Sequence, residues 1–381
     1  MRRAGTQKNW GAPPWRIASQ PQRSGMPSEV DVAIIGGGFS GLAAGAWLVR
    51  LAPEKKVVVL EADRIGAGAS GRTGGVALAE TAVGDLPGLG DVLDGFRKHL
   101  DELQVECELN LSGAWEIGRH FARRDSPIEW KDHGTLRVIG EVAGGTVDAG
   151  KLLSGLAAGV ERRGGVLCEL AQVESVVFDP APRLQLGSGE IHAGQVIFAT
   201  NAFSLELSGL AGRAESEFTL ALATGPLADV QLEALGLGER KPFYTVDLPY
   251  LWGRLLSDHR VMFGSGLVHA EDWRDLDTLN IERGQTADLL AWLERRVRGL
   301  HPVLRDVEIT HRWGGPILFG EGWQPIFSRH PQSDKAIVLG AYAGHGVALS
   351  VYLGCWAAEV LLERKELPAW GQIGASPQRL L

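Results

Sequence analysis

Three glycines and one carboxylate have the types and spacing that a dinucleotide site requires. Gly36, Gly38 and Gly41 fill the G-x-G-x-x-G positions after the mostly apolar run 30–35. The first glycine permits a tight turn, the second lets backbone approach a pyrophosphate, and the third lets a helix pack on a strand. Glu61 follows the last glycine by about twenty residues, where an acid binds both ribose hydroxyls and disfavours the 2′-phosphate of NADP.

The elements around these residues must form one strand–turn–helix–strand unit. The pattern predicts strands over 30–35 and 57–60 and a helix of small and apolar residues over 42–51, which Pro53 ends. The N-terminal amides of that helix, together with its dipole, would hold phosphate charge. Further helices are expected over 91–103, 148–162, 286–300 and 347–362.

Composition bounds the class of protein. The chain has 381 residues, of which 45% are hydrophobic and 22% charged, enough to bury a large core and form two interleaved domains. A net charge of -8 argues against broad nucleic-acid binding. The first 28 residues contain no apolar signal region, and the apolar segment 347–358 is too short to span a bilayer.

The cysteine pattern points to a reducing compartment. Cys107, Cys168 and Cys355 are far apart and form no C-x-x-C pair, so neither a metal site nor a disulfide framework is indicated. Buried thiols are the simpler reading. We therefore expect a cytoplasmic protein with no metal and no membrane partner, which could form a homo-oligomer.

A second glycine-rich run carries a family resemblance. Residues 68–75 read G-A-S-G-R-T-G-G, a density of glycine that suggests backbone pressed close to a ligand. This run resembles the FAD-dependent oxidoreductases of the D-amino-acid oxidase superfamily, which include gamma-glutamylputrescine, sarcosine and glycine oxidase-like enzymes. The strand end 196–202 and the glycine turn 341–346 are similar to the same family.

The resemblance implies the architecture and the domain boundaries. It predicts an α/β protein with an FAD-binding Rossmann-like domain of the glutathione-reductase type and a second, antiparallel-sheet substrate domain. The FAD-binding domain would comprise 28–82, 150–215 and 310–381, and the substrate domain 83–149 and 216–309. Residues 1–27 would form an N-terminal arm, either extended along the surface or frayed.

The same resemblance implies a noncovalent FAD site. In the family the turn 341–346 lies under the pyrimidine end of the flavin, and the backbone of residue 173 meets the adenine. Arg72 would contact a cofactor phosphate or the substrate channel, with a surface role as the alternative. The residues expected to contact FAD are Gly36, Gly38, Phe39, Ser40, Gly41, Glu61, Ala62, Gly68, Ala69, Ser70, Arg72, Thr73, Gly74, Gly75, Val173, Ala199, Thr200, Gly344, His345, Gly346 and Val347.

Catalytic candidates are few, because oxidation of an amine by a flavin needs orientation and exclusion of water more than acid–base groups. Tyr342 and His345 lie in the turn expected beneath the flavin. Tyr250 and Arg254 lie where related enzymes bring a strand over it. Arg254 could pair with a substrate carboxylate, and the alternative is an ordinary surface arginine.

Other aromatic and histidine residues have weaker cases. Trp252, Trp313 and Trp323 could wall the pocket or belong to the core. His269 could reach the site, although a surface role is the simpler reading, and His99 is expected at the surface.

Two departures from sarcosine oxidases bear on mechanism. No cysteine lies between Cys168 and Cys355, so cysteinyl attachment of flavin is not expected. Ser265 falls roughly where those enzymes place an oxygen-activating lysine, so oxygen need not be the acceptor.

The expected function is oxidation of a C–N bond of an amine or amino acid to an imine, with hydride transfer to flavin N5. Oxygen, giving hydrogen peroxide, or another acceptor would reoxidise the flavin. Three alternatives stay open: a dehydrogenase passing electrons to a quinone or protein, a catalytically silent flavin-binding subunit, and an NAD-binding protein.

Overall fold

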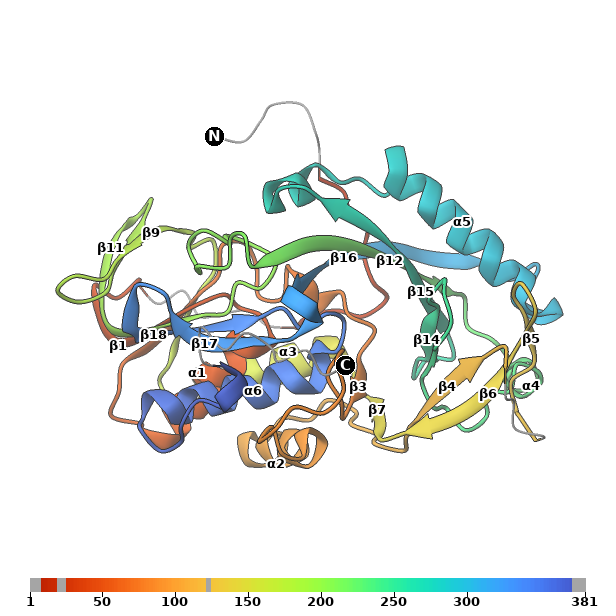
Figure 1. Ribbon diagram of the computed structural model, residues 1–381, viewed down its shortest axis with the longest axis horizontal. Coiled ribbons are helices and arrows are strands. Elements are labelled where there is room, and N and C mark those ends of the chain that lie inside the picture. Colours follow the sequence, from red (N-terminus) through yellow and green to blue (C-terminus); the bar gives the residue numbers. More distant parts are fainter. Residues whose placement is uncertain (1–7, 19–24, 121–124, 372–381) are drawn as a thin grey trace.

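Two eight-stranded sheets form the framework of the molecule (Figure 1). The computed structural model describes residues 8–18, 25–120 and 125–371. The first sheet has the strand order β17-β18-β11-β1-β2-β8, and β9 and β10 extend β11 as an antiparallel hairpin. Its central strands run parallel: β1 (Glu29–Ile35), β2 (Val57–Leu60), β8 (Val166–Cys168), β11 (Gly189–Phe198) and β18 (Ser333–Gly340). The remaining strands are β9 (Val173–Val177), β10 (Arg183–Leu186) and β17 (Ile326–His330).

Helices cover one face of the first sheet (Figure 1). They are α1 (Phe39–Leu51), α2 (Val92–Leu103), α3 (Ala149–Glu161) and α6 (Gly346–Leu361). Helix α1 packs between α3 and α6, where small residues permit close contact: a Cβ on Gly354 would lie 2.4 Å from the Ser40 carbonyl oxygen. The predicted strands and helices of this unit are confirmed, with ends shifted by a few residues. His99 on α2 is not the expected surface residue, because its ring packs against Trp47 and Tyr352.

The second sheet is antiparallel except where β13 pairs with β4. In spatial order its strands are β16 (Ile309–Gly320), β12 (Ala214–Thr224), β15 (Val261–Ala270), β14 (Trp252–Leu255), β13 (Phe243–Thr245), β4 (Ala114–Gly118), β6 (Thr135–Val142) and β5 (Trp130–Lys131). Helix α5 (Gly284–Leu300) packs on one face, and the other helix of this region is α4 (Asp229–Ala234). A small ladder joins β3 (Val76–Leu78) to β7 (Gly144–Thr146).

Strand β16 corrects a predicted domain boundary. It pairs with β12 along almost its whole length, so it belongs to the second sheet, although 310–381 was assigned to the FAD-binding domain. Gly314 and Gly315 lie within this pairing. The chain returns to the first sheet only after β16, at β17 and β18.

The N-terminal arm, in its described part 8–18, is docked on the protein. Trp10 is 2% exposed, its indole donates to the Leu276 carbonyl at 2.9 Å, and its own carbonyl accepts from the Gly314 amide at 2.8 Å. The Trp15 indole donates to the Gly71 carbonyl at 2.8 Å. This part of the arm is therefore extended and held, and the rest of the predicted arm, except 25–27, lies outside the described residues.

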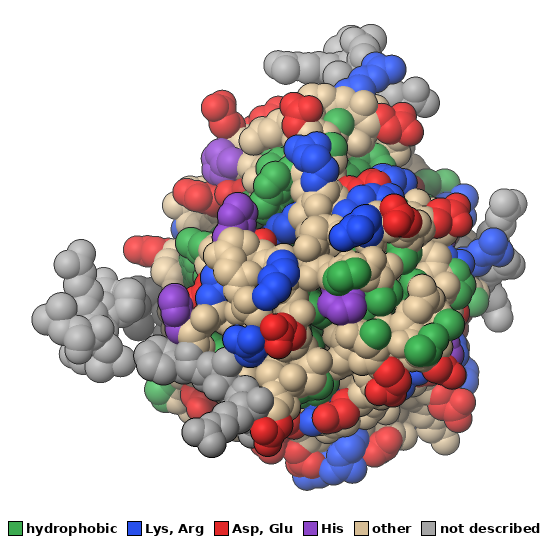
Figure 2. Space-filling view, turned by 90° about the vertical axis from the view of Figure 1, so that its right-hand side faces the viewer, with side chains coloured by type: hydrophobic (Ala, Val, Ile, Leu, Met, Phe, Trp, Pro, Cys, Tyr) green, Lys and Arg blue, Asp and Glu red, His purple; other side chains and the backbone are tan. Residues whose placement is uncertain are grey.

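The outer surface offers mixed charge. Figure 2 views the molecule from the side of β5 and α4, where acidic and basic side chains are interspersed over the face. Within the described ranges, no helix has the length and apolar character needed to cross a membrane.

Candidate active site

A cavity of about 1050 Å³ lies between the carboxyl ends of the parallel strands and the second sheet. Gly36, Glu61, Ala199 and Ala341 directly follow β1, β2, β11 and β18, and the first three line this cavity. Open parallel sheets bind ligands at this edge. Most of the predicted FAD contacts are brought together here, and among the predicted FAD contacts and catalytic residues only Gly41, Gly75 and Arg254 do not line it.

The first glycine turn is shaped by the protein's own backbone at two of its three positions. A Cβ on Gly36, where φ is +116°, would lie 2.4 Å from the Ala199 carbonyl oxygen, and one on Gly41 would lie 2.0 Å from the Gly36 carbonyl oxygen. At Gly38, which lines the cavity, the nearest atom is the Ser70 Oγ at 2.9 Å. Gly38 is therefore the motif glycine whose space is left for a ligand.

The Glu61 carboxylate is fixed at the end of β2. Its oxygens accept hydrogen bonds from the amides of Gly37 at 2.8 Å and Asp63 at 2.9 Å. Burial raises the pKa of this carboxyl, while the two amide hydrogen bonds act in the opposite direction. Each oxygen keeps a further lone pair, so the group can still accept from ribose hydroxyls.

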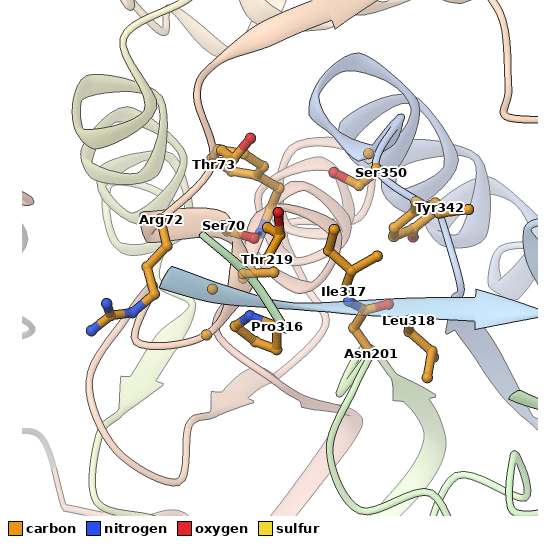
Figure 3. A pocket seen from close by; sticks show the side chains of 18 of the residues that line it. Ser70, Arg72, Thr73, Asn201, Thr219, Pro316, Ile317, Leu318, Tyr342 and Ser350 are labelled. Carbon is orange, nitrogen blue, oxygen red and sulfur yellow. Dashed lines mark hydrogen bonds between the residues drawn. The ribbon is translucent and has the colours of Figure 1, made fainter. Parts of the chain in front are cut away.

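The glycine loop 66–75 folds over the start of α1. Ser70 Oγ accepts a hydrogen bond from the Phe39 amide at 3.0 Å. The Arg72 guanidinium donates to the carbonyl oxygens of Trp10 (3.2 Å), Gly11 (2.9 Å) and Gly314 (3.1 Å). Figure 3 shows it extending away from the other labelled side chains. Arg72 thus joins the loop to the arm and β16. It also lines the cavity, so its contact with a cofactor phosphate or the substrate channel stays a prediction.

The turn between β18 and α6 closes the opposite end of the cavity. The Asn201 side-chain oxygen accepts from the Ala341 amide at 3.0 Å, and the hydroxyls of Tyr342 and Ser40 share a hydrogen bond at 2.7 Å. Asn201 and Tyr342 are labelled in Figure 3. His345 Nδ1 donates to the Ala343 carbonyl oxygen at 3.3 Å. Burial raises the pKa of Tyr342 and lowers that of His345, so both side chains are neutral near pH 7.

Two buried polar atoms on the cavity wall have no protein partner in the described structure. They are Thr200 Oγ1 at the end of β11 and Ser350 Oγ on the first turns of α6. Buried polar groups in native proteins are nearly always hydrogen-bonded, so a polar ligand is expected to satisfy them. Together with the space at Gly38 and the acceptor at Glu61, they fit an extended dinucleotide.

The second sheet forms the remaining wall. Tyr250, Trp252 and Trp323 line the cavity as predicted. Trp313 does not, because it is buried and donates to the Arg72 carbonyl at 3.0 Å. His269 also lies outside the cavity, exposed and paired with Glu217.

Arg254 matches neither of its two predicted roles. It is only 8% exposed, so it is not a surface arginine, and it does not line the cavity. Its Nη2 lies beside Gly75, where a Cβ would approach it to 3.2 Å, and its Nε has no hydrogen-bond partner. Burial lowers its pKa to about 10.

A buried ion network supports the loop 246–251 at the mouth of the cavity. Asp132 Oδ2 accepts from Arg296 Nη2 at 2.6 Å and from Arg119 Nη2 at 2.9 Å, and the side chains of Asp132 and Arg296 are almost fully buried. Arg296 also donates to the carbonyl oxygens of Pro249 (2.7 Å) and Tyr250 (2.9 Å). The network therefore fixes the backbone that presents Tyr250.

Sequence reasoning missed several wall residues. They are Tyr244, Leu248, Phe319 and Ser350, which line the cavity from β13, the following loop, β16 and α6. Tyr244 and Phe319 lie on strands, but a strand pattern does not say which face meets a ligand. The loop residue carries no local signal.

Comparison with known proteins identifies the family. A family model described as FAD dependent oxidoreductase (DAO) matches residues 31–143 and 92–360. The chain belongs to this family. It is therefore an FAD-dependent enzyme, and the earlier alternative of an NAD-binding protein is excluded.

Two curated relatives cover most of the chain. It is 27% identical over 378 residues to the gamma-glutamylputrescine oxidoreductase of Escherichia coli (strain K12), covering 87% of this chain and 83% of that protein. It is 24% identical over 409 residues to the probable oxidoreductase OrdL of Rhizobium meliloti (strain 1021), covering 91% and 88%.

Solved structures share the fold. Glycine oxidase from Geobacillus kaustophilus aligns with a TM-score of 0.71 at 20% identity, covering 92% of this chain and 100% of that one. L-proline dehydrogenase from P. horikoshii aligns with a TM-score of 0.73 at 16% identity, covering 91% and 97%. The predicted fold class is confirmed.

Proposed function

We propose that the enzyme oxidises a C–N bond of an amine or amino acid to an imine. The observation that supports this most is that the α6 N-terminus, the turn 341–346 and aromatic residues of the second sheet line one cavity. Bound FAD would accept the hydride from the carbon next to nitrogen, and the imine would hydrolyse in water to a carbonyl compound and the released amine.

The protein's own residues would orient the substrate and exclude water from it. Tyr250 and Trp252 line the same cavity as the turn and would hold the reacting carbon against the flavin. The start of α6, where amides lack intrahelical acceptors, would stabilise negative charge delivered to the cofactor. The neutral state of Tyr342 and His345 suits a reaction that needs no strong general base in the wall.

The test begins with the purified holoenzyme. Anaerobic addition of a panel of amines and amino acids should bleach the flavin absorbance, and the bleached sample should release a carbonyl product. A chain that binds FAD but is bleached only by dithionite would contradict the proposal and favour the silent flavin-binding subunit.

We also propose that FAD is bound noncovalently. All three cysteines are described and none lines the cavity. Acid precipitation should leave yellow FAD in the supernatant, whereas a yellow pellet would contradict this.

The proposed acceptor is one other than oxygen. Ser265 hydrogen-bonds the Tyr250 carbonyl and Arg296, and the lysine found on the described wall, Lys8, is paired with Asp277 at 3.0 Å. Without a free ammonium near the turn, reduced enzyme should react faster with quinones or dyes than with oxygen. Stopped-flow mixing compares them, and rapid return of the oxidised spectrum with oxygen would contradict the proposal.

A further inference from the structure

None of the charged side chains on the described cavity wall belongs to a strand of the second sheet, to the loop 246–251 or to the turn 341–346. The charged residues among the described lining are Lys8, Glu61, Asp63, Arg72 and Asp277. Two of them pair with each other, Lys8 with Asp277, and Arg72 is occupied by carbonyl oxygens. Glu61 and Asp63 lie at the end of β2, on the ribose side.

The substrate side is apolar and aromatic. Its described wall, contributed by the second sheet, the loop 246–251 and the turn 341–346, carries no charged side chain. The bulky members are Tyr244, Leu248, Tyr250, Trp252, Phe319 and Trp323. Aromatic faces attract ammonium groups and offer nothing to a carboxylate.

Arg254, on the same strand as Trp252, does not line the cavity. Trp252 is two residues earlier and its ring lies against Gly74, on the cavity lining. Arg254 lies beside Gly75, with Met262 opposite on β15. This strand therefore presents an indole ring to the cavity, and its guanidinium is not part of the lining.

Two carboxylates next to a residue of this wall add negative charge to the substrate side. The Tyr244 hydroxyl, which is on a cavity-lining residue, lies 3.3 Å from Glu116 Oε1 and 3.5 Å from Glu80 Oε1. Neither carboxylate forms an ion pair with a cation in the described residues. Their charge favours a cationic substrate and repels an anionic one.

We infer that the substrate is an amine whose reacting carbon carries no carboxylate, rather than an α-amino acid; this rests on the proposed function. An unpaired carboxylate moved from water into this wall would cost several kcal/mol, about 100-fold or more in binding. The ammonium form of an amine would be stabilised by the aromatic faces, and its deprotonated form would donate the hydride.

The test uses pairs of substrates that differ only in a carboxylate. The pairs are benzylamine and phenylglycine, 2-phenylethylamine and phenylalanine, and butylamine and norvaline, each added anaerobically to the holoenzyme. Amines should reduce the flavin with a second-order rate constant about 100-fold above that of their amino-acid partners. Faster reduction by the amino acids would overturn the inference and leave the proposed function intact. Reduction by neither member of any pair would overturn the proposed function, and the inference with it.

Binding without chemistry gives an independent readout. Cumylamine and 2-amino-2-phenylpropanoic acid lack hydrogen on the carbon next to nitrogen, so neither can give a hydride. Calorimetry should detect the amine with a dissociation constant about 100-fold below that of the acid. Equal or tighter binding of the acid would overturn the inference.

A matched pair of variants tests whether negative charge near the wall favours amines over amino acids. Glu116→Gln should lower the amine preference about tenfold by removing one carboxylate charge, whereas Glu174→Gln, on the exposed β9, should leave it unchanged. FAD affinity should be the same in both variants. An amine preference that is unchanged in Glu116→Gln would show that this carboxylate does not act on the substrate, and would remove the electrostatic part of the inference.

Discussion

The two walls of the cavity are built on different principles. The cofactor wall comes largely from turns that directly follow β1, β2, β11 and β18, and its shape depends on backbone geometry, as at Gly36 and Gly41. The substrate wall comes from β13, β14, β16 and the loop 246–251, and its shape depends on large side chains. An ion network of residues far apart in the chain holds that loop. The cofactor wall can be recognised from local sequence, whereas the substrate wall is assembled from segments that are distant in the chain.

This difference teaches where each property of the enzyme resides. Backbone turns at strand ends can hold any dinucleotide with the same outline, so they define the cofactor and the family. Side chains on a separate sheet can change without disturbing that outline, so they define the substrate. Perturbing each wall should therefore affect only its own property.

The largest effect is expected from Gly38→Val. A valine there would meet only the Ser70 side chain within the protein but would fill space facing the cavity, so the apo protein should fold and FAD affinity should fall at least about 100-fold. Equilibrium dialysis measures FAD, and circular dichroism checks the apo fold. Gly299→Val, with no neighbouring atom at its Cβ position, is the control. Full FAD occupancy in Gly38→Val would mean that the pyrophosphate lies elsewhere.

The second variant, Asp132→Asn, changes the ion network that supports the substrate wall. It removes the counter-charge from Arg119 and Arg296, which should destabilise the protein by about 3–5 kcal/mol and loosen the loop that carries Tyr250. Urea unfolding measures the stability, and steady-state kinetics should give a raised KM. The FAD dissociation constant should stay within about twofold of the parent value. If FAD is lost while KM is unchanged, the two walls are not separable.

A pH effect is expected beneath the cofactor wall, at His99. Burial between the aromatic rings lowers its pKa to about 4, and its Nδ1 has no partner. Below about pH 6.5 the His99 side chain binds a proton in the unfolded chain but stays neutral in the folded chain. The free energy of unfolding should therefore fall between about pH 6.5 and 4. The loss is at most about 3 kcal/mol at 1.36 kcal/mol per pKa unit. His99→Gln should flatten that slope, and an unchanged slope would assign the acid sensitivity to other groups.

The smallest effect is expected at the start of α6. Gly346→Pro removes one amide at the first helical position, where proline is tolerated, and should cost about 0.3–2 kcal/mol of charge stabilisation on the reduced cofactor. Flavin reduction should slow about two- to thirtyfold with FAD still bound. Gly346→Ala is the control, because its Cβ crowds Tyr342 equally at 3.1 Å but keeps the amide. Equal rates in the two variants would mean that this amide does not face the cofactor.

How well the sequence predicts a residue's place also differs between local backbone turns and long side chains. Gly36, Glu61 and the residues after β11 could be placed because each is tied to its strand by covalent neighbours and by a steric rule about glycine. The partners of Arg72 and Arg254 could not be placed in this way, because a guanidinium contacts whatever the fold brings within reach of its long side chain. For Arg72 those partners were carbonyls of residues 10, 11 and 314.

The sequence by itself determined a dinucleotide site and the order of the first βαβ unit, because these depend on spacing within a few tens of residues. The resemblance of its glycine runs indicated FAD and the family. Only the tertiary structure decided that β16 belongs to the second sheet, that the carbonyls of Trp10 and Gly11 accept from Arg72 of the glycine loop, and that no described charge lines the substrate side. The reason is physical: strand pairing, burial and the direction of a side chain are set by partners that are distant in the chain, and local pattern carries no record of them.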